Sequence, residues 1–285
     1  MQILTYHLKD GCSLLCTTQD DSSVSLVYGG GGGCTLEVIG ETSGVWISLC
    51  GSLQINEAGL TQPMRAKEMV TTPYTARINT VGHGRGRWLA ILGGRKTWAM
   101  LFASTTSSDS HLFSEKYVSS RQLRSKAIAL ARSTSQLESE AALYGVADSV
   151  AELQAPLHPA VARCPGRTYV KRRQVFIRLQ RVRNFIAACC DRELDNNVLA
   201  GMANYSPCHF LRTFEDVYLE TPHDYLIKQR MLRAEGLLRR GKLAVSEVAA
   251  ASGFGNCSAF SRSFRKYFGK TASEIKCDQF STKNV

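Results

Sequence analysis

The sequence lacks both a long hydrophobic run and a recognisable leader. No apolar stretch reaches the roughly 20 residues that a membrane-spanning helix needs. The first residues, Met1-Gln2-Ile3-Leu4, do not form the basic lead and apolar core of a secretory signal. We therefore expect a cytoplasmic protein with no membrane partner. In that compartment its ten cysteines should be reduced rather than paired.

Metal ligands and nucleophiles do not cluster anywhere along the chain. The closest cysteines, Cys12 with Cys16 and Cys189 with Cys190, have no further ligands at a recognised metal-site spacing. The five glycines at 29–33 are not followed by the helix and Lys of a phosphate-binding loop, so we expect a flexible loop between strands. The histidines that a metal enzyme would need are scattered singly, at His7, His83, His111 and His158. The sequence thus predicts no catalytic residue, no metal and no cofactor, and hence no enzyme.

Basic residues concentrate in the second part of the chain. Residues 1–160 carry 13 Lys and Arg against 13 Asp and Glu, whereas residues 161–285 carry 22 against 11. The whole formal net charge of +11 therefore belongs to the second part. A basic part beside a neutral part indicates one module that binds a polyanion and another module with a different role.

Two similar stretches, residues 199–214 and 248–264, each predict a short helix, a tight turn and a second helix. Asn204 and Gly253 occupy the turns, where the backbone must be left-handed, and Gly or Asn adopts that conformation most readily. Ser206 is a suitable N-cap for the helix that follows, with Pro207 in its first turn. Apolar pairs at i and i+4 anchor the second helix of each stretch to a core, namely Phe210 with Phe214 and Phe260 with Phe264. Because the matches continue past these helices, we interpret them as an internal duplication of about 50 residues.

A wider set of positions in the duplicated segment forms a recognisable pattern. They are Ser206-Pro207 with Phe210, Arg212 and Phe214; Thr221-Pro222 with Tyr225; Arg230, Leu232, Ala234 and Leu238; Val248-Ala249 with Gly253-Phe254; and Phe260, Arg262 and Phe264 with Phe268-Gly269. With these residues, the segment from about 171 to 276 resembles the DNA-binding domain of AraC-type transcription regulators. Leu219, Ala272 and Asn204 depart from the Gly, Pro and Gly that are frequent in the family, and these departures concern turn geometry.

The resemblance implies that the second helix of each pair is a recognition helix that enters the major groove of double-stranded DNA. In register with the family, the base-reading positions are Cys208, Leu211, Arg212, Cys257, Ser258 and Arg262. Arg212 and Arg262 are suited to bidentate pairing with guanine, and Asn256 can bond a base or a phosphate. Phosphate contacts are expected from Ser206, Arg265, Lys266, Lys270, Thr271 and Ser273. The alternative for the two arginines is a structural ion pair, for instance with Glu215 or Glu247.

Residues 1–112 predict a mostly β domain, because short alternating runs are separated by turn signals. The candidate strands are residues 25–28, 35–39, 45–49, 52–56, 65–70, 76–80, 88–92 and 97–102. Such strands followed by segregated helices favour a sandwich or barrel, and the family resemblance implies a cupin-like jelly roll here. The Gly-rich stretch at 82–87 is expected to be a mobile hairpin connection.

From residue 113 the period becomes helical. Ser114 is predicted to cap one helix, and a second helix should begin near Gln136. These helices either form a dimer surface or cover the sheet. Because prolines then interrupt the chain at 156, 159 and 165, we expect an N-terminal sensing or dimerisation domain at 1–165. That domain would comprise a β sandwich at 1–112 and helices at 113–154.

The remaining residues, 166–285, should form the DNA-binding domain, which is all-α with two helix-turn-helix units. One helix is expected over 167–190, with some of its arginines near the DNA backbone. A linking helix is expected over 224–240, with Arg233 pointing outward. Ser246 should cap the second helix pair, and 277–285 should be a disordered tail.

These observations favour a sequence-specific DNA-binding transcription regulator, more often an activator than a repressor by its resemblance. The partners implied are double-stranded DNA and RNA polymerase, and the sequence leaves open a homodimer and a small-molecule or protein effector on the N-terminal domain. Two alternatives remain. One is a cupin-type metal enzyme with an accessory basic domain, and the other is a non-specific architectural nucleic-acid binder.

Overall fold

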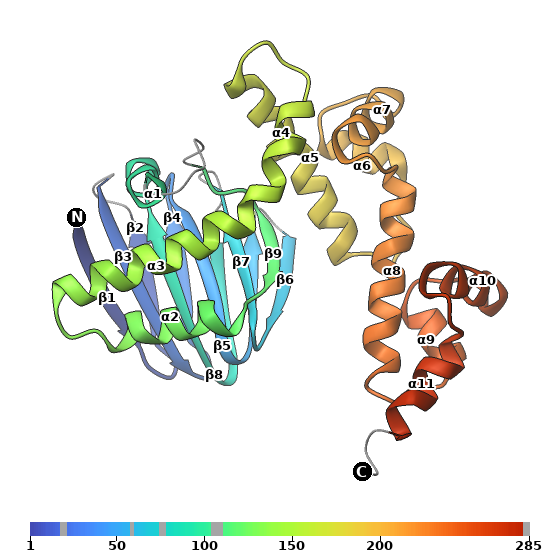
Figure 1. Ribbon diagram of the computed structural model, residues 1–285, viewed down its shortest axis with the longest axis horizontal. Coiled ribbons are helices and arrows are strands. Elements are labelled where there is room, and N and C mark those ends of the chain that lie inside the picture. Colours follow the sequence, from blue (N-terminus) through green and yellow to red (C-terminus); the bar gives the residue numbers. More distant parts are fainter. Residues whose placement is uncertain (18–21, 58–59, 74–77, 104–110, 282–285) are drawn as a thin grey trace. The chain divides into compact units, whose positions relative to one another are not determined.

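The computed structural model describes all residues except 18–21, 58–59, 74–77, 104–110 and 282–285, and the side chains of 78–85 and 277–281 (Figure 1). The chain divides into two compact units, residues 1–159 and 160–285. The first unit is a β-sheet covered by helices, and the described elements of the second are helices. A mostly β N-terminal part followed by an all-helical part with two helix-turn-helix units is thereby confirmed.

One hydrogen-bonded sheet holds the nine strands found among the described residues. They are β1 (Gln2–Leu8), β2 (Ser13–Thr17), β3 (Ser23–Gly31), β4 (Thr35–Ile39), β5 (Ser43–Glu57), β6 (Leu60–Arg65), β7 (Glu68–Thr72), β8 (Ile78–Gly93) and β9 (Glu115–Val118). The main path runs β1-β3-β8-β5-β7-β9, with β1 parallel to β3 and the later neighbours antiparallel. The long strands β5 and β8 pair with each other and form the centre of the sheet.

The two faces of this sheet bury different hydrophobic clusters. Val45 and Ile47 of β5 belong to one cluster, and Trp46 between them belongs to the other, as the alternation of side chains along a strand requires. Helices α1 (Arg95–Phe102), α2 (Arg121–Arg132) and α3 (Gln136–Gln154) cover the first cluster, with α2 and α3 lying across the sheet (Figure 1). The second cluster draws residues from β1 to β8, so the sheet curls around it. The jelly-roll topology stays a prediction.

Several predicted strand boundaries are wrong. Residues 45–49 and 52–56 belong to one strand, β5, which continues through an irregularity in its register near Cys50 and Gly51. Residues 65–70 span the end of β6, a turn with Lys67 at φ 70, and the start of β7. Residues 97–102 form helix α1 rather than a strand, since Trp98, Leu101 and Phe102 pack together against the sheet. Of the strand predicted at 76–80, Ala76 and Arg77 lie outside the described residues.

The two glycine-rich stretches of the first unit lie mostly in strands rather than in the loops that we expected. Residues 29–31 are the end of β3, where they pair with residues 86–88 of β8, and only Gly32 and Gly33 lie in the connection to β4. The stretch at 82–87 lies wholly inside β8, which pairs there with both β5 and β3, so the expected hairpin connection does not exist. Pairing on both sides supplies the ladder hydrogen bonds that hold glycine in an extended strand.

The helix after the sheet begins later than predicted. Ser114 does not cap a helix, because residues 115–118 form β9, and the Ser114 hydroxyl instead donates to the Glu57 carboxylate at 2.8 Å. Ser120 caps α2 by accepting a hydrogen bond from the Leu123 amide at 3.0 Å. Ser135 caps α3 in the same way, which agrees with the start predicted near Gln136.

A 3-10 turn, Ala155–Leu157, and helix α4 (His158–Arg163) occupy the proline-rich segment at the junction of the units. The second unit continues with α5 (Tyr169–Ala188), α6 (Asn196–Met202), α7 (Pro207–Tyr218), α8 (Pro222–Leu238), α9 (Val245–Ala251), α10 (Cys257–Phe268) and α11 (Ala272–Ser281). Within this unit, Figure 1 shows the α6–α7 pair at one end of α8 and α9, α10 and α11 along its other part. Helix α8 therefore links two similar halves.

Two expectations about the second unit are wrong. Helix α9 begins after Ala244 rather than at Ser246, and the Glu247 carboxylate accepts from the Ala244 amide at 2.6 Å. Residues 277–281 are helical in α11, and only 282–285 of the predicted tail lie outside the described residues. The nine cysteines whose side chains are described are all free thiols. Among the described helices, none combines the length and the apolar character required to cross a membrane.

Candidate nucleic-acid interface

The first helix-turn-helix unit consists of α6 and α7. Asp195 caps α6 by accepting from the Asn197 amide at 2.9 Å. Asn204 stands in the turn at φ 57, which confirms the predicted left-handed position. Ser206 is the N-cap residue of α7 with Pro207 in the first turn, although the Ser206 hydroxyl makes no capping hydrogen bond. The side chain of Ser206 therefore remains available for another contact.

The second unit consists of α9 and α10, and its turn requires glycine. Gly253 has φ 85, and a Cβ atom there would lie 2.8 Å from the Cys190 carbonyl oxygen, which is too close for any side chain. Asn256 caps α10, since its Oδ1 accepts from the Ala259 amide at 2.7 Å. That contact occupies the oxygen of Asn256, whereas its amide nitrogen makes no hydrogen bond to a described residue.

Buried phenylalanines fix the orientation of both recognition helices, α7 and α10. All four anchors are fully buried, namely Phe210 and Phe214 in α7 and Phe260 and Phe264 in α10. The ring centroids are 5.6 Å apart within the first pair and 5.3 Å apart within the second. Because one side of each helix is thus committed to the core, the two residues that follow the first anchor face outward, namely Leu211 and Arg212 on α7 and Ser261 and Arg262 on α10.

Every residue predicted to read bases is exposed. These residues are Cys208, Leu211 and Arg212 on α7, and Asn256, Cys257, Ser258 and Arg262 at the start and along α10. The side chains of Arg212 and Arg262 make no hydrogen bond or ion pair within the part of the chain that the structure describes. The ion pairs considered with Glu215 and Glu247 are therefore not formed. Both guanidinium groups are free to pair with a base.

The residues predicted to contact phosphate lie in α10 or shortly after it, apart from Ser206 at the start of α7. Exposed members of this group are Ser206, Arg265, Lys266, Lys270 and Ser273. Thr271 is half-buried, and its hydroxyl accepts from the Glu274 amide at 3.3 Å while the Thr271 amide donates to the Glu274 carboxylate at 2.6 Å. The main observed role of Thr271 is therefore to cap helix α11. The hydrogen bond from the Thr271 amide lowers the pKa of the Glu274 carboxylate, and the nearby charges of Arg265 and Lys270 lower it further. One carboxylate therefore lies among these cations.

Two arginines of α8 have a role that sequence reasoning missed. Arg230 donates from Nε to the Cys190 carbonyl at 2.7 Å and from Nη2 to the Arg192 carbonyl at 2.9 Å, and its guanidinium lies 5.6 Å from the centroid of the Phe254 ring. Arg233, which was expected to point outward, donates to the Ala251 carbonyl at 2.9 Å.

The second bond of Arg233 completes a bridge between the two halves. Its Nη2 lies 3.0 Å from Oδ2 of Asp191. The segment around Asp191 joins α5 to α6 in the first half, whereas Ala251 and Phe254 belong to the second half. Both arginines therefore fix the two recognition units relative to each other. The spacing of three residues between them is the only sequence signal, since it places both on one face of α8.

Arginines of α5 are also occupied by contacts inside the second unit. The guanidinium of Arg178 lies 5.3 Å from the centroid of the Tyr205 ring. Arg183 lies 5.2 Å from the ring of Tyr218 and 4.7 Å from that of Tyr225. Such cation–π contacts stabilise packing. The idea that arginines of this helix approach DNA stays a prediction for the exposed members.

In comparisons with known proteins, the helical part of the chain matches a helix-turn-helix family model and several regulatory proteins. The family model described as "Helix-turn-helix domain" matches residues 199–276. The Regulatory protein SoxS of Escherichia coli strain K12 is 31% identical over 86 residues, which cover 30% of this chain and 80% of SoxS. The Msm operon regulatory protein of Streptococcus mutans is 29% identical over 98 residues, covering 34% of this chain. The chain spans only about a third of the length of that relative (35%).

Among solved structures, the DNA-binding domain of AdpA, described as a global transcriptional factor in complex with a target DNA, is similar to this chain. The two share 28% identity with a TM-score of 0.35, and the match covers 37% of this chain and 95% of the AdpA domain.

Proposed function

Because the chain belongs to the AraC-type family of transcription regulators, we propose that it binds double-stranded DNA sequence-specifically and regulates transcription. The observation that carries this proposal is the pair of exposed recognition helices. Each helix is anchored by two buried phenylalanines and presents an arginine with no partner in the described chain, in a part of the chain that carries the whole net charge of +11.

Base reading belongs to the outward residues of α7 and α10. Arg212 and Arg262 each offer a fork of donors that matches O6 and N7 of guanine, and such a pair contributes about 1–3 kcal/mol of discrimination. Cys208, Leu211 and Cys257 supply apolar contacts of the kind that a thymine methyl accepts. Ser258 and the amide nitrogen of Asn256 supply hydrogen bonds.

Phosphate contacts position the two helices without reading sequence. We assign them to the exposed side chains of Ser206, Arg265, Lys266, Lys270 and Ser273, and to the hydroxyl of Thr271, which can still donate. Because one rigid helix, α8, joins the two units, they should enter successive major grooves, about 34 Å apart on straight DNA or closer on bent DNA. The site bound by one protomer should then be asymmetric, since the two reading surfaces differ.

We further propose roles for the first unit and for the whole protein. Residues 1–165 would sense a signal or dimerise, and the DNA-bound protein would act on RNA polymerase, more often as an activator. The protein would work in the cytoplasm and without catalysis. Among the described residues, no group of three or more His, Cys, Asp or Glu side chains could hold a metal ion, which gives the metal-enzyme alternative no support.

The test uses a duplex selected from a random-sequence pool by the full-length protein, with an unselected duplex for comparison. Arg262→Ala should weaken binding to the selected duplex about tenfold, and to the unselected one far less, because a base contact is lost. Arg265→Ala, the control, should weaken both about equally because it removes a phosphate contact. Equal losses with Arg262→Ala would exclude a base contact there. Failure of selection to enrich any sequence would favour the architectural binder instead.

A further inference from the structure

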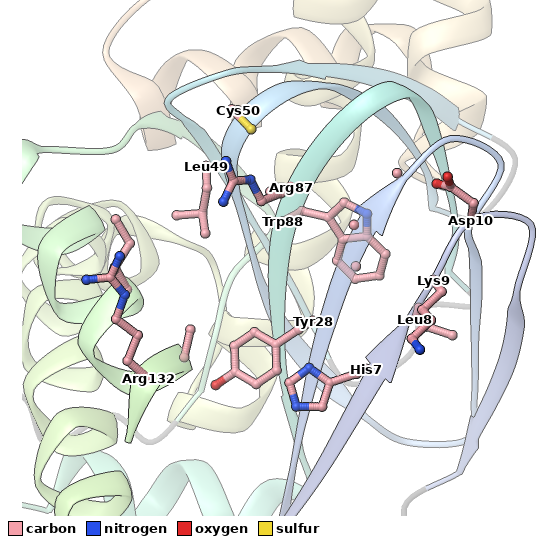
Figure 2. A pocket seen from close by; sticks show the side chains of 15 residues that line it. His7, Leu8, Lys9, Asp10, Tyr28, Leu49, Cys50, Arg87, Trp88 and Arg132 are labelled. Carbon is pink, nitrogen blue, oxygen red and sulfur yellow. The ribbon is translucent and has the colours of Figure 1, made fainter. Parts of the chain in front are cut away.

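A hollow with a volume of about 1040 Å³ lies in the first unit (Figure 2). Its walls come from β1, β3, β5 and β8 on the sheet and from the end of α2. Tyr28 and Leu49, which line it, pack against the cluster beneath the helices, and Ile128 and Ala131 face it from α2. The part of the hollow that these residues line therefore lies between α2 and the sheet.

The glycine run of β3 makes the space. Gly29 gives its side-chain position to the Trp88 ring, from which a Cβ atom would be only 2.0 Å away. A Cβ atom on Gly30 would meet nothing within 4 Å. Because Gly30 follows Tyr28 by two residues in the same strand, that empty position is on the side of the sheet that Tyr28 occupies. Any side chain at position 30 would fill part of the hollow.

The charged groups around the hollow are mainly cations. Arg87 of β8 and Arg132 of α2 are exposed, and neither side chain makes a hydrogen bond or ion pair with any described residue. In Figure 2 both arginines extend toward the part of the hollow beside Leu49. The single lining carboxylate, that of Asp10, already accepts from the Gly32 amide at 2.7 Å.

One buried polar atom of the wall is a donor without an acceptor. The Tyr28 hydroxyl is buried and has no hydrogen-bond partner among the described residues. Burial raises the pKa of Tyr28 to about 12, so its hydroxyl keeps its proton at neutral pH. A buried donor with no acceptor is costly and uncommon in native proteins. Because this hydroxyl has almost no accessible surface, the ring of Tyr28 is the part that a ligand can contact.

The rest of the lining is apolar or aromatic. The Tyr28 ring stacks on His7 with 5.1 Å between centroids, and Leu49, Ile128 and Ala131 complete the wall. We propose that this hollow binds an organic anion with an apolar body, whose acidic group pairs with Arg87 and Arg132 while its body lies on Tyr28, Leu49 and Ile128. The binding step is independent of the DNA-binding function proposed above.

The test compares two fluorescent probes of similar shape on the full-length protein without DNA. One is the anion 8-anilino-1-naphthalenesulfonate, and the other is its uncharged analogue N-phenyl-1-naphthylamine. The anion should bind saturably, with Arg87→Met and Arg132→Met each weakening it about tenfold and leaving the neutral probe nearly unchanged. Arg121→Met, at the exposed start of the same helix α2, is the matched control and should change neither.

A second variant tests the place of binding without removing charge. Gly30→Leu should fill the hollow and weaken both probes, while its circular dichroism spectrum and thermal midpoint stay close to those of the unmodified protein. The proposal would be overturned if the arginine variants bound the anion normally, or if the neutral probe bound as tightly as the anion. Normal binding of both probes to a folded Gly30→Leu variant would overturn it as well.

Discussion

Leu219 and Gly269 end the two recognition helices in the same left-handed conformation, at φ 59 and φ 70. Glycine adopts this conformation freely, whereas a residue with a Cβ atom is strained there by about 1–2 kcal/mol. Leu219 gains little in exchange, because the residue is 73% exposed. The first half therefore carries backbone strain that the second half lacks.

Replacing Leu219 by Gly should stabilise the protein by about 0.5–1 kcal/mol, once the greater freedom of glycine in the unfolded chain is subtracted. Urea unfolding followed by circular dichroism would measure the gain. Leu219→Ala keeps the Cβ atom and should stay within about 0.5 kcal/mol of the unmodified protein. A gain with Ala as large as that with Gly would show that backbone strain is not the cause.

Gly253→Ala should act in the opposite direction. The added methyl group would meet the Cys190 carbonyl in a backbone conformation that already disfavours alanine, and we expect a loss of at least about 2 kcal/mol. Gly255→Ala is the matched control, since Gly255 has open space around its Cβ position and no left-handed φ. Thermal unfolding of both variants would separate the two cases, and equal midpoints would contradict the close contact.

Turn chemistry explains which single residues the sequence could predict. Asn204 and Gly253 were recognised because few residue types tolerate a left-handed turn. The position of Ser246 could not be predicted in the same way, because serine is common both at caps and inside first turns. Here the Glu247 carboxylate accepts from the Ala244 amide and so caps the start of α9. The sequence does not reveal the engagement of Thr271 with Glu274, because a threonine at the start of a helix can serve either as a cap or as a phosphate contact.

At the scale of elements, the helices of the second unit were predictable and several strands were not. Each recognition helix has phenylalanines at i and i+4 with an arginine at i+2, and a strand would place that arginine on the same face as the phenylalanines. The pattern therefore favours a helix, and the structure buries all four phenylalanines. Helix α1 was mistaken for a strand because its six predicted residues include Thr97, Trp98 and Phe102, which favour strands on intrinsic preference. Packing on the sheet overrode that preference. The exposed clusters of the candidate site followed from the helices, whereas the hollow formed by long-range pairing of β3 and β8 did not.

The arginine bridge on α8 should control how rigidly the two recognition units are spaced. Arg230→Met would remove bonds to the Cys190 and Arg192 carbonyls and leave the helix itself intact. We expect about tenfold weaker binding to the selected duplex, because ordering two loosely joined units costs entropy on binding. Gel-shift titrations would measure the affinity.

Changing the distance between the two DNA half-sites distinguishes this spacing role of Arg230 from a general loss of folding or affinity. When the two half-sites are moved apart by a few base pairs, the unmodified protein should lose affinity steeply and Arg230→Met much less. Arg240→Met is the control, since Arg240 is exposed at the end of the linking helix and its side chain bonds to no described residue. An Arg230→Met variant with unchanged dependence on spacing would argue against a spacing role.

For the whole molecule, the uneven charge should make DNA binding strongly dependent on salt. The logarithm of the association constant should fall linearly with the logarithm of salt concentration, by about 0.9 for each phosphate contact on duplex DNA. Arg265→Ala should reduce this slope by about 1. The control Arg121→Ala removes a cation from the neutral first unit and should leave the slope unchanged. A slope near zero for the full-length protein would contradict the phosphate contacts.

The two recognition helices present different side chains, so a protomer bound to DNA has a defined orientation along the duplex. Helix α7 begins with Ser206-Pro207 and α10 with Asn256-Cys257, so turning a bound protomer end for end would bring the wrong surface to each groove. A promoter could therefore carry the same target in either orientation with different consequences, because α7 would lie upstream of α10 in one case and downstream of it in the other. A target for one protomer should therefore be directional rather than palindromic.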